Sequence, residues 1–227
     1  MKKIYNPYTD ICGKNIFKGD LHFHSTLSDG KSSPQEMFDR LVEYGFDFCG
    51  LADHDLPNNE IMTHEQLLVF PGQEFSDENG HIVALNTPII RKEHWDIGTQ
   101  LEEISSSGGF SILSHPKIRE FGTSQGLAYS PKRLIVDLAG LYDGMEIYTH
   151  NVGSGFKLAI DRLDAVWNAI SLLQETDPDK PFGPIWGFSS SDGHHVDHIS
   201  SNVGIMVWAE KLCQENIMSA IKAKSVT

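Results

Sequence analysis

The sequence predicts an α/β fold in which strands and helices alternate and the strands close into a barrel. Short apolar runs alternate along the chain with segments whose apolar residues recur at helical spacing. Residues that carry chemistry stand repeatedly at the ends of the apolar runs, which is where barrel enzymes place them. The 227 residues contain no repeat or linker, so residues 1–227 are predicted to form a single domain.

Strands and helices are predicted from length and apolar spacing. The predicted strands are Phe17–Phe23, Phe46–Ala52, Leu67–Phe75, Ile82–Asn86, Phe110–Ser114, Met145–Tyr148, Ile185–Ser189 and Val203–Trp208. The predicted helices are Pro34–Tyr44, Ile97–Ser106, Pro131–Leu138, Phe156–Leu173 and Asn216–Lys224. Pro34 and Pro131 each follow a serine, an order typical of a helix start. Because the two kinds of element alternate, we expect parallel β-α-β units.

Composition argues against two classes of partner. The formal net charge of −13 does not fit a nucleic-acid-binding surface, which needs clustered lysine and arginine. No apolar run approaches the roughly 18 residues that span a membrane. The expected partner is therefore a small molecule. The three cysteines form no disulfide pattern, and the N-terminal segment does not resemble a signal peptide, so we expect a cytoplasmic protein.

The first chemical motif is a pair of histidines, His22 and His24, at the end of a predicted strand. Residues two apart on a strand point to the same face, so both imidazoles can bind one ion. For this pair alone, two solvated histidines on an edge strand would be the simpler explanation. Asp20 is expected to accept a hydrogen bond from one of the rings.

Carboxylates follow in the next two segments. Asp29 lies in a Ser-Asp-Gly turn, where it needs no function by itself but could serve as a ligand. Asp53, His54 and Asp55 leave an apolar run, and such a cluster is costly to bury unless it is paired or bound to a metal. A helix N-cap is the alternative for Asp55. Glu74 ends another apolar run, and its carboxylate could bridge two ions.

The remaining candidates lie further along the chain. His81 precedes one predicted strand and His115 ends another, while Asp192 and His194 repeat the two-residue spacing of the first motif. A surface histidine or a polar loop explains each of them in isolation. Glu146 ends the sixth predicted strand. The basic pair that follows His115 is predicted to bind an anionic substrate; it consists of Lys117 and Arg119.

Together these residues predict two or three divalent ions, because imidazole and carboxylate ligands suit Zn, Mn or Fe. Two neighbouring ions would acidify a bridging water, polarise the scissile bond and stabilise the leaving oxygen. The sequence therefore indicates a metal-dependent hydrolase. It contains no nucleophile-elbow, Walker A or dinucleotide motif that would support another chemistry.

The ordered motifs DLHFHS, SDG, ADHD, GQE, HIVAL, SHP and SDGHH resemble the PHP family, named for polymerase and histidinol phosphatase. The opening segment is most similar to the CehA/McbA-type hydrolases of that family. The resemblance implies a distorted (β/α)7 barrel, related to the TIM barrel, with metals at the strand C-termini. It implies one ion at His22, His24, Glu74 and Asp192, a second at Glu74, His81 and His115, and a third at Asp29, His54 and His194. Catalytic roles are expected for Asp192, Glu74 and His194.

The function expected from the family is a phosphoesterase acting on a small phosphorylated metabolite or nucleotide through a metal-activated bridging hydroxide. The first alternative is a carbamate, ester or amide hydrolase of the CehA/McbA type. The second is a degenerate PHP module that binds without catalysis. A degenerate module would have lost ligands, whereas every expected ligand type is present in this sequence.

Overall fold

The computed structural model describes residues 14–55, 63–77, 80–88, 96–115, 138–150 and 185–223. These residues contain an eight-stranded sheet with the order β7-β6-β5-β4-β3-β2-β1-β8. The strands are β1 (Asn15–Phe23), β2 (Phe48–Leu51), β3 (Leu68–Asp77), β4 (Gly80–Leu85), β5 (Phe110–Ser114), β6 (Gly144–Thr149), β7 (Trp186–Ser190) and β8 (Ile205–Ala209). Each strand overlaps one of the predicted strands.

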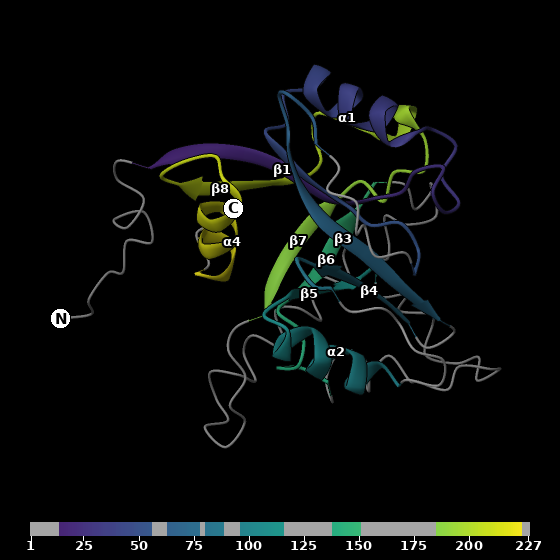
Figure 1. The fold of residues 1–227 in the computed structure, drawn as a ribbon, viewed down its shortest axis with the longest axis vertical. Helices are drawn as coiled ribbons and strands as arrows, with labels where there is room; N and C mark the ends of the chain where they lie inside the picture. The colour runs from purple at the N-terminus through teal and green to yellow at the C-terminus, as the bar shows by residue number, and fades with distance from the viewer. Residues whose placement is uncertain are drawn as a thin grey trace.

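The sheet curls so that β7 approaches β1 and β8, which gives a nearly closed barrel (Figure 1). Beyond β7, Gly193 forms a parallel bridge with Phe23 of β1. The His24 N–H donates to the Gly193 carbonyl at 2.8 Å, and the Asp192 N–H donates to the His22 carbonyl at 2.9 Å. The α/β barrel predicted from the sequence is therefore confirmed, and the closure brings the first and last motifs together.

Strand directions are mixed, which corrects the expectation of parallel units throughout. The pairs β1–β2, β2–β3, β5–β6 and β6–β7 are parallel, whereas β3–β4, β4–β5 and β1–β8 are antiparallel. Only two residues of sequence separate β3 from β4. A connection this short can join antiparallel strands but cannot cross over to a parallel one.

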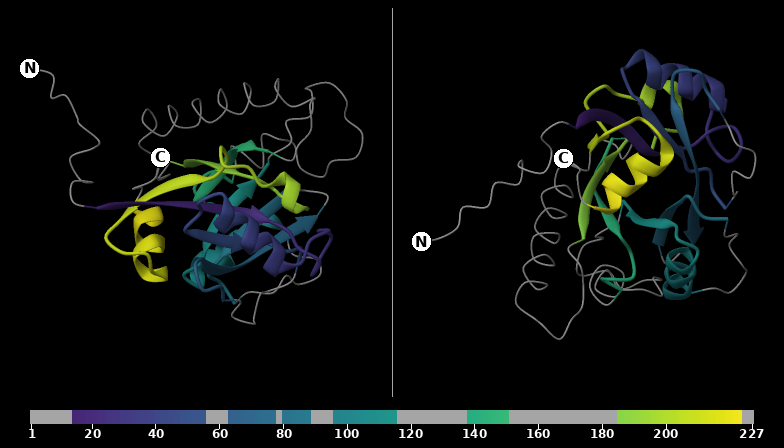
Figure 2. Two further views of the ribbon diagram at one scale, coloured as in Figure 1. Left: turned by 90° about the horizontal axis from the view of Figure 1, so that it is seen from above. Right: turned by 60° about the vertical axis from the view of Figure 1, so that its left-hand side comes forward.

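The helices among the described residues lie outside the sheet. They are α1 (Pro34–Glu43), α2 (Ile97–Ser106), α4 (Gln214–Lys222) and the short 3-10 helix η3 (Val196–His198). Figure 1 shows α1 and α2 on opposite sides of the molecule, and Figure 2 shows α4 beside β8. The predicted helices Pro131–Leu138, apart from Leu138 itself, and Phe156–Leu173 fall outside the described residues.

Helix α1 begins at a capping box, as the Ser-Pro signal predicts. The Ser33 N–H donates to the Glu36 carboxylate at 2.8 Å, and the Glu36 N–H donates back to the Ser33 hydroxyl at 3.3 Å. This reciprocal pair satisfies two backbone donors at the start of the helix.

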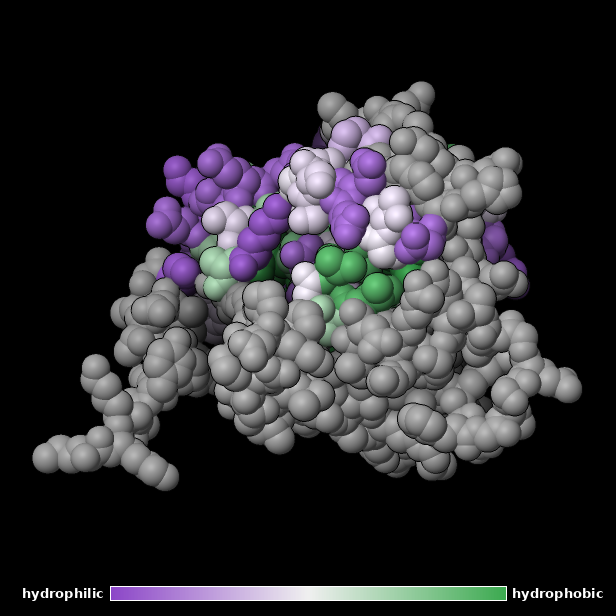
Figure 3. All heavy atoms as spheres, turned by 90° about the horizontal axis from the view of Figure 1, so that it is seen from below, coloured by the Kyte–Doolittle hydropathy of each residue, from purple (hydrophilic) through white to green (hydrophobic). Residues whose placement is uncertain are grey.

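No helix in the described part of the chain is long and apolar enough to span a membrane. On the face shown in Figure 3, hydrophilic side chains adjoin a smaller hydrophobic patch.

Phenylalanine rings fill the barrel interior. Phe48 and Phe70 are fully buried and meet edge to face at 6.0 Å between ring centroids. Gly19 permits this packing, because a Cβ at that position would lie 2.0 Å from the Phe48 ring. Gly144 has the same relation to Phe188, at 2.2 Å. The packed interior leaves the polar residues to gather around one end of the barrel.

Candidate metal centre

Four donor groups converge where β1 ends. His22 Nε2 lies 3.1 Å from His24 Nε2. The two oxygens of Glu74 lie 3.4 Å from His22 Nε2 and 3.5 Å from His24 Nε2. Asp192 Oδ1 lies 3.5 Å and 3.3 Å from the same two nitrogens. The structure thus brings together the four residues expected to hold the first ion, and three of them are completely buried.

Glu74 stands at the centre of a wider cluster. Its Oε1 lies 3.1 Å from His81 Nδ1 and 3.2 Å from His115 Nε2, while its Oε2 lies 3.1 Å from His54 Nδ1. The β3–β4 register explains the position of His81, which stands opposite Ser76, on the same face as Glu74. The residues expected to hold the second ion are therefore adjacent to those of the first, and Glu74 is shared.

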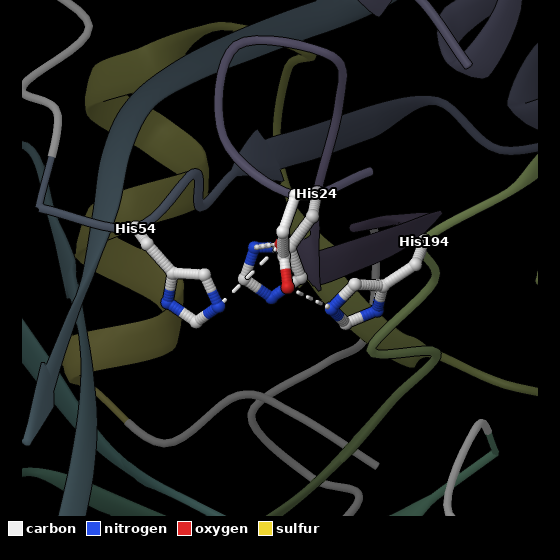
Figure 4. Close-up of side chains that lie close together, drawn as sticks. His24, His54 and His194 are labelled. Carbon is white, nitrogen blue, oxygen red and sulfur yellow. Dashed lines mark ion pairs between the residues drawn. The ribbon is translucent and has the colours of Figure 1, made fainter. Parts of the chain in front are cut away.

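The residues expected to hold the third ion, Asp29, His54 and His194, lie next to His24. Asp29 Oδ1 lies 3.5 Å from His54 Nε2, and its Oδ2 lies 3.3 Å from His194 Nε2. The ring of His24 lies between those of His54 and His194, with centroid distances of 4.4 and 4.3 Å (Figure 4). The side chain of Asp29 is 54% exposed, whereas that of Glu74 is fully buried. This third cluster is therefore the one that faces solvent.

Two of the gathered residues have unusual backbone conformations. His115, directly after β5, has a φ of 23°, and Asp192, shortly after β7, has a φ of 48°. Positive φ is uncommon for residues other than glycine and is favoured by few side chains, aspartate among them. Such conformations cluster at functional sites, where the surrounding structure holds them in place.

Asp53 anchors the loop that carries Asp29. Its Oδ1 accepts from the Ser25 N–H at 2.8 Å and from the Ser28 hydroxyl at 2.6 Å, and its Oδ2 accepts from the Ser25 hydroxyl at 2.7 Å. Asp53 is completely buried. The Lys31 N–H also donates to the His194 carbonyl at 2.7 Å, which ties the end of the same loop to the last motif.

The residue that orients an imidazole is Glu146 rather than Asp20. Asp20 Oδ1 accepts from the backbone N–H groups of His22 and Ser191, at 3.3 and 3.2 Å. Glu146 Oε1 instead accepts from His22 Nδ1 at 2.8 Å. The sequence predicts Glu146 at the end of a strand but indicates no role for it. The available signal was an acidic residue between the apolar neighbours Met145 and Ile147.

Burial and charge oppose one another throughout the cluster. Burial lowers the pKa of His22, but the neighbouring carboxylates, chiefly Glu146 and Glu74, raise it well above its usual value. Burial raises the pKa of Glu74, but the adjacent imidazoles hold it well below its usual value. Asp192 follows the same pattern, and its pKa falls to about 2. In His24, burial prevails and lowers the pKa. The buried carboxylates therefore need positive charge beside them.

The predicted substrate-binding pair, Lys117 and Arg119, lies outside the described residues. Its contribution to the site remains a prediction from the sequence.

Solved structures with a similar fold are known, whereas no protein-family model matches the chain. The similarity covers 94% of this chain and 64% of a two-domain protein from Bacteroides vulgatus that contains a predicted PHP-like metal-dependent phosphoesterase, with a TM-score of 0.62 and 18% identity. The chain has a PHP-like fold. This chain therefore spans less than two thirds of the length of the Bacteroides protein.

Other similar proteins carry different names. An amidohydrolase from Chromobacterium violaceum matches with a TM-score of 0.55 and 15% identity. The match covers 92% of this chain and 97% of the amidohydrolase. The lesion-specific endonuclease EndoQ from Pyrococcus furiosus matches with a TM-score of 0.54 and 15% identity. The match covers 92% of this chain and 56% of EndoQ. A sequence comparison matches 50 residues of this chain to the DNA polymerase/3'-5' exonuclease PolX of Bacillus subtilis with 36% identity. The matched segment is 22% of this chain and 9% of PolX.

Proposed function

We propose that this PHP-like chain is a metal-dependent hydrolase whose histidines and carboxylates hold two or three divalent ions. The observation that carries the proposal is the position of Glu74. This buried carboxylate has imidazole nitrogens within 3.1–3.5 Å of both of its oxygens. A carboxylate in such a position can bridge two cations, which a neutral imidazole cannot do.

The chemistry of the donor set fits cations. His22 Nε2, His24 Nε2 and the oxygens of Glu74 and Asp192 face one another, and all of these atoms can offer lone pairs. Among the described residues, every ion pair made by Glu74 or Asp192 is to a histidine, a side chain that can release its proton. Within the described part of the chain, buried His24 Nδ1 has no hydrogen-bond partner, and Asp29 Oδ1 lies 3.8 Å from it.

The assignment of ligands follows the three clusters. The first ion would be held by His22, His24, Glu74 and Asp192, the second by Glu74, His81 and His115, and the third by Asp29, His54 and His194. Mixed imidazole and carboxylate ligands suit Zn, Mn or Fe. Ions bound there would acidify a water molecule and polarise the scissile bond.

Asp192 and His194 are the residues best placed to act on a substrate. Asp192 Oδ1 lies 3.7 Å from His194 Nδ1, so the two side chains join the buried first cluster to the open third cluster. Both side chains are partly exposed, at 12% and 21%. A carboxylate at this boundary can accept a proton during hydrolysis. Glu74, in contrast, is buried and acts by holding the ions.

For the substrate, we propose a small phosphorylated metabolite or nucleotide. The similar structures that are named a predicted metal-dependent phosphoesterase and an endonuclease support this choice, as does the basic pair Lys117 and Arg119. The similar amidohydrolase favours the alternative, hydrolysis of an amide, ester or carbamate.

A substrate screen tests the proposal. Protein reconstituted with Zn, Mn or Fe would be assayed on phosphomonoesters, phosphodiesters, amides, esters and carbamates, with Asp192→Asn as the inactive control. We expect phosphate-ester hydrolysis that depends on added metal and disappears in the variant. Faster turnover of a neutral substrate would replace the phosphoesterase by its alternative. Absence of metal-dependent turnover on every class would contradict the hydrolase.

A further inference from the structure

Glu146 is a buried carboxylate outside the proposed ligand sets, and it accepts four hydrogen bonds. Its Oε1 accepts from His22 Nδ1 at 2.8 Å and from the Ser190 hydroxyl at 2.5 Å. Its Oε2 accepts from the His115 backbone N–H at 2.7 Å and from the Thr149 hydroxyl at 3.2 Å. A carboxylate offers about four lone-pair positions. Protein donors therefore occupy all of them, so an ion held by Glu146 with His22 and His115 would have to displace at least one of these donors.

The contact with His22 determines which ring nitrogen carries the proton. An ionised carboxylate can only accept, so His22 Nδ1 is the donor. In neutral His22 the lone pair is then on Nε2, the atom that faces His24 and Glu74. An acceptor behind a ligating histidine fixes the tautomer and the ring orientation, and it raises the basicity of the ligand.

The contact with His115 acts on the backbone. His115 has a φ of 23°, which side-chain-bearing residues rarely adopt. Leu113 pairs in parallel register with Met145, and this register places Glu146 beside the residue that follows β5. The hydrogen bond from the His115 N–H helps to hold this conformation while His115 Nε2 lies 3.2 Å from Glu74 Oε1.

We propose that Glu146 is a positioning residue that sets the ring tautomer of His22 and the backbone of His115 at the same time. One buried carboxylate thereby couples a ligand of the first ion to a ligand of the second. The inference rests on the proposed metal centre. It goes beyond that centre because it assigns a role to a side chain that does not touch the ions.

The test compares Glu146→Gln with a matched control, Asp143→Asn. A glutamine keeps the shape of Glu146 but has a single acceptor oxygen, and because His22 and His115 approach different oxygens of Glu146, the amide cannot accept from both. Asp143 also links β6 to β5, because it accepts from the Ser111 N–H at 2.8 Å and from the Ser111 hydroxyl at 3.2 Å. It contacts none of the proposed ligands among the described residues. Asp143 directly precedes β6, so both variants lose one carboxylate that joins the β6 segment to the β5 segment.

Zinc affinity and stoichiometry would be measured by competition with a chromophoric chelator, together with thermal unfolding. We expect Glu146→Gln to bind zinc about tenfold to a hundredfold more weakly at unchanged stoichiometry, as is typical when the partner of a ligand is removed. Asp143→Asn should keep the affinity of the parent protein. Equal affinity in Glu146→Gln and the parent would overturn the inference. Loss of one whole ion at unchanged affinity for the others would also overturn it, because Glu146 would then be a ligand.

A second measurement needs no variant. In the zinc-loaded parent protein, ¹⁵N NMR of the histidine rings should show His22 protonated at Nδ1 and metal-bound at Nε2. The opposite arrangement would contradict the inference even if Glu146→Gln failed to fold. Failure of the parent protein to bind zinc, Mn or Fe would instead remove the proposed function itself, so the two failures can be told apart.

Discussion

Glu74 and His22 face each other at 3.4 Å, and neither side chain is exposed to solvent. Glu74 is also within 3.2 Å of His81, His115 and His54 and 3.5 Å from His24, so its charge is shared among five imidazoles. A buried charge of this kind is strongly destabilising when its partners are removed. The proposed metal centre therefore depends on this carboxylate more than on any other side chain.

Glu74→Gln should abolish turnover while the barrel still folds. The amide has the same shape, but it lacks the charge that holds cations between the histidines. Removing a residue that only contacts a metal ligand lowers metal affinity or activity about tenfold to a hundredfold. Removing this shared ligand itself should therefore lower kcat/KM at least about a hundredfold. Glu43→Gln, a change at an exposed residue paired with Arg40, is the control and should remain active. Near-normal activity of Glu74→Gln at saturating metal would place the site elsewhere.

Asp53→Asn should affect the third cluster selectively. Asp53 holds the loop of Asp29 through Ser25 and Ser28, and an asparagine cannot accept all three of those hydrogen bonds. We expect a loss of about 1–3 kcal/mol in the free energy of unfolding and weaker binding of the most exposed ion. Ser28→Ala removes one of the three bonds and should have a smaller effect in the same direction. Identical metal titrations of both variants and the parent protein would show that this loop does not position a ligand.

Stability should respond to pH in opposite ways with and without metal. Burial lowers the pKa of His22 and His115, but neighbouring carboxylates outweigh it and raise both above 6.5, the usual value for histidine. A raised pKa stabilises the fold below that usual value, and the gain is lost as pH rises through the pKa of the folded protein. Bound ions require neutral imidazoles, so metal binding strengthens as the pH rises.

The midpoint of thermal unfolding would therefore be measured between about pH 6 and 9, in chelator and in excess zinc. In chelator, the midpoint should fall as the pH rises. The difference between the zinc and chelator curves should widen over the same range. Parallel curves would show that protons and metal ions do not compete for the same nitrogens.

Arg119→Ala distinguishes a phosphoesterase from a hydrolase of neutral substrates. A guanidinium can hold two phosphate oxygens, and a charge-assisted contact contributes about 1.5–3 kcal/mol. We therefore expect kcat/KM for a phosphate ester to fall roughly tenfold to a hundredfold, with metal content unchanged. A neutral ester or carbamate should be affected much less. Equal losses on charged and neutral substrates would argue against an anion-binding role for Arg119.

Much of the fold and the gathering of the site followed from local sequence patterns. His22 and His24 are two residues apart at the end of β1, a spacing that on an extended chain puts both rings on one face. Apolar runs that end in Asp, His or Glu predicted the end of the barrel where the polar residues meet. The outlier conformations of His115 and Asp192 were not predictable, because they depend on contacts made after the strands assemble.

The predictions that failed depend on how neighbouring strands align in the folded protein. The part played by Glu146 depends on its alignment with His115, which follows β5 and lies 31 residues earlier in the chain. Asp20 was a reasonable candidate by proximity, but its carboxylate accepts from backbone N–H groups instead of a ring. The antiparallel β3–β4 pair follows from a two-residue connection within a stretch predicted to consist of parallel units.

Elemental analysis of protein purified without chelator tests the metal centre most directly. The convergence of imidazole and carboxylate donors around Glu74 and His24 predicts at least two transition-metal ions per chain, either as purified or after reconstitution with zinc, manganese or iron. Glu74→Gln, analysed in parallel, should retain fewer ions than the parent protein. Less than about half an ion per chain in the reconstituted parent protein would contradict the account.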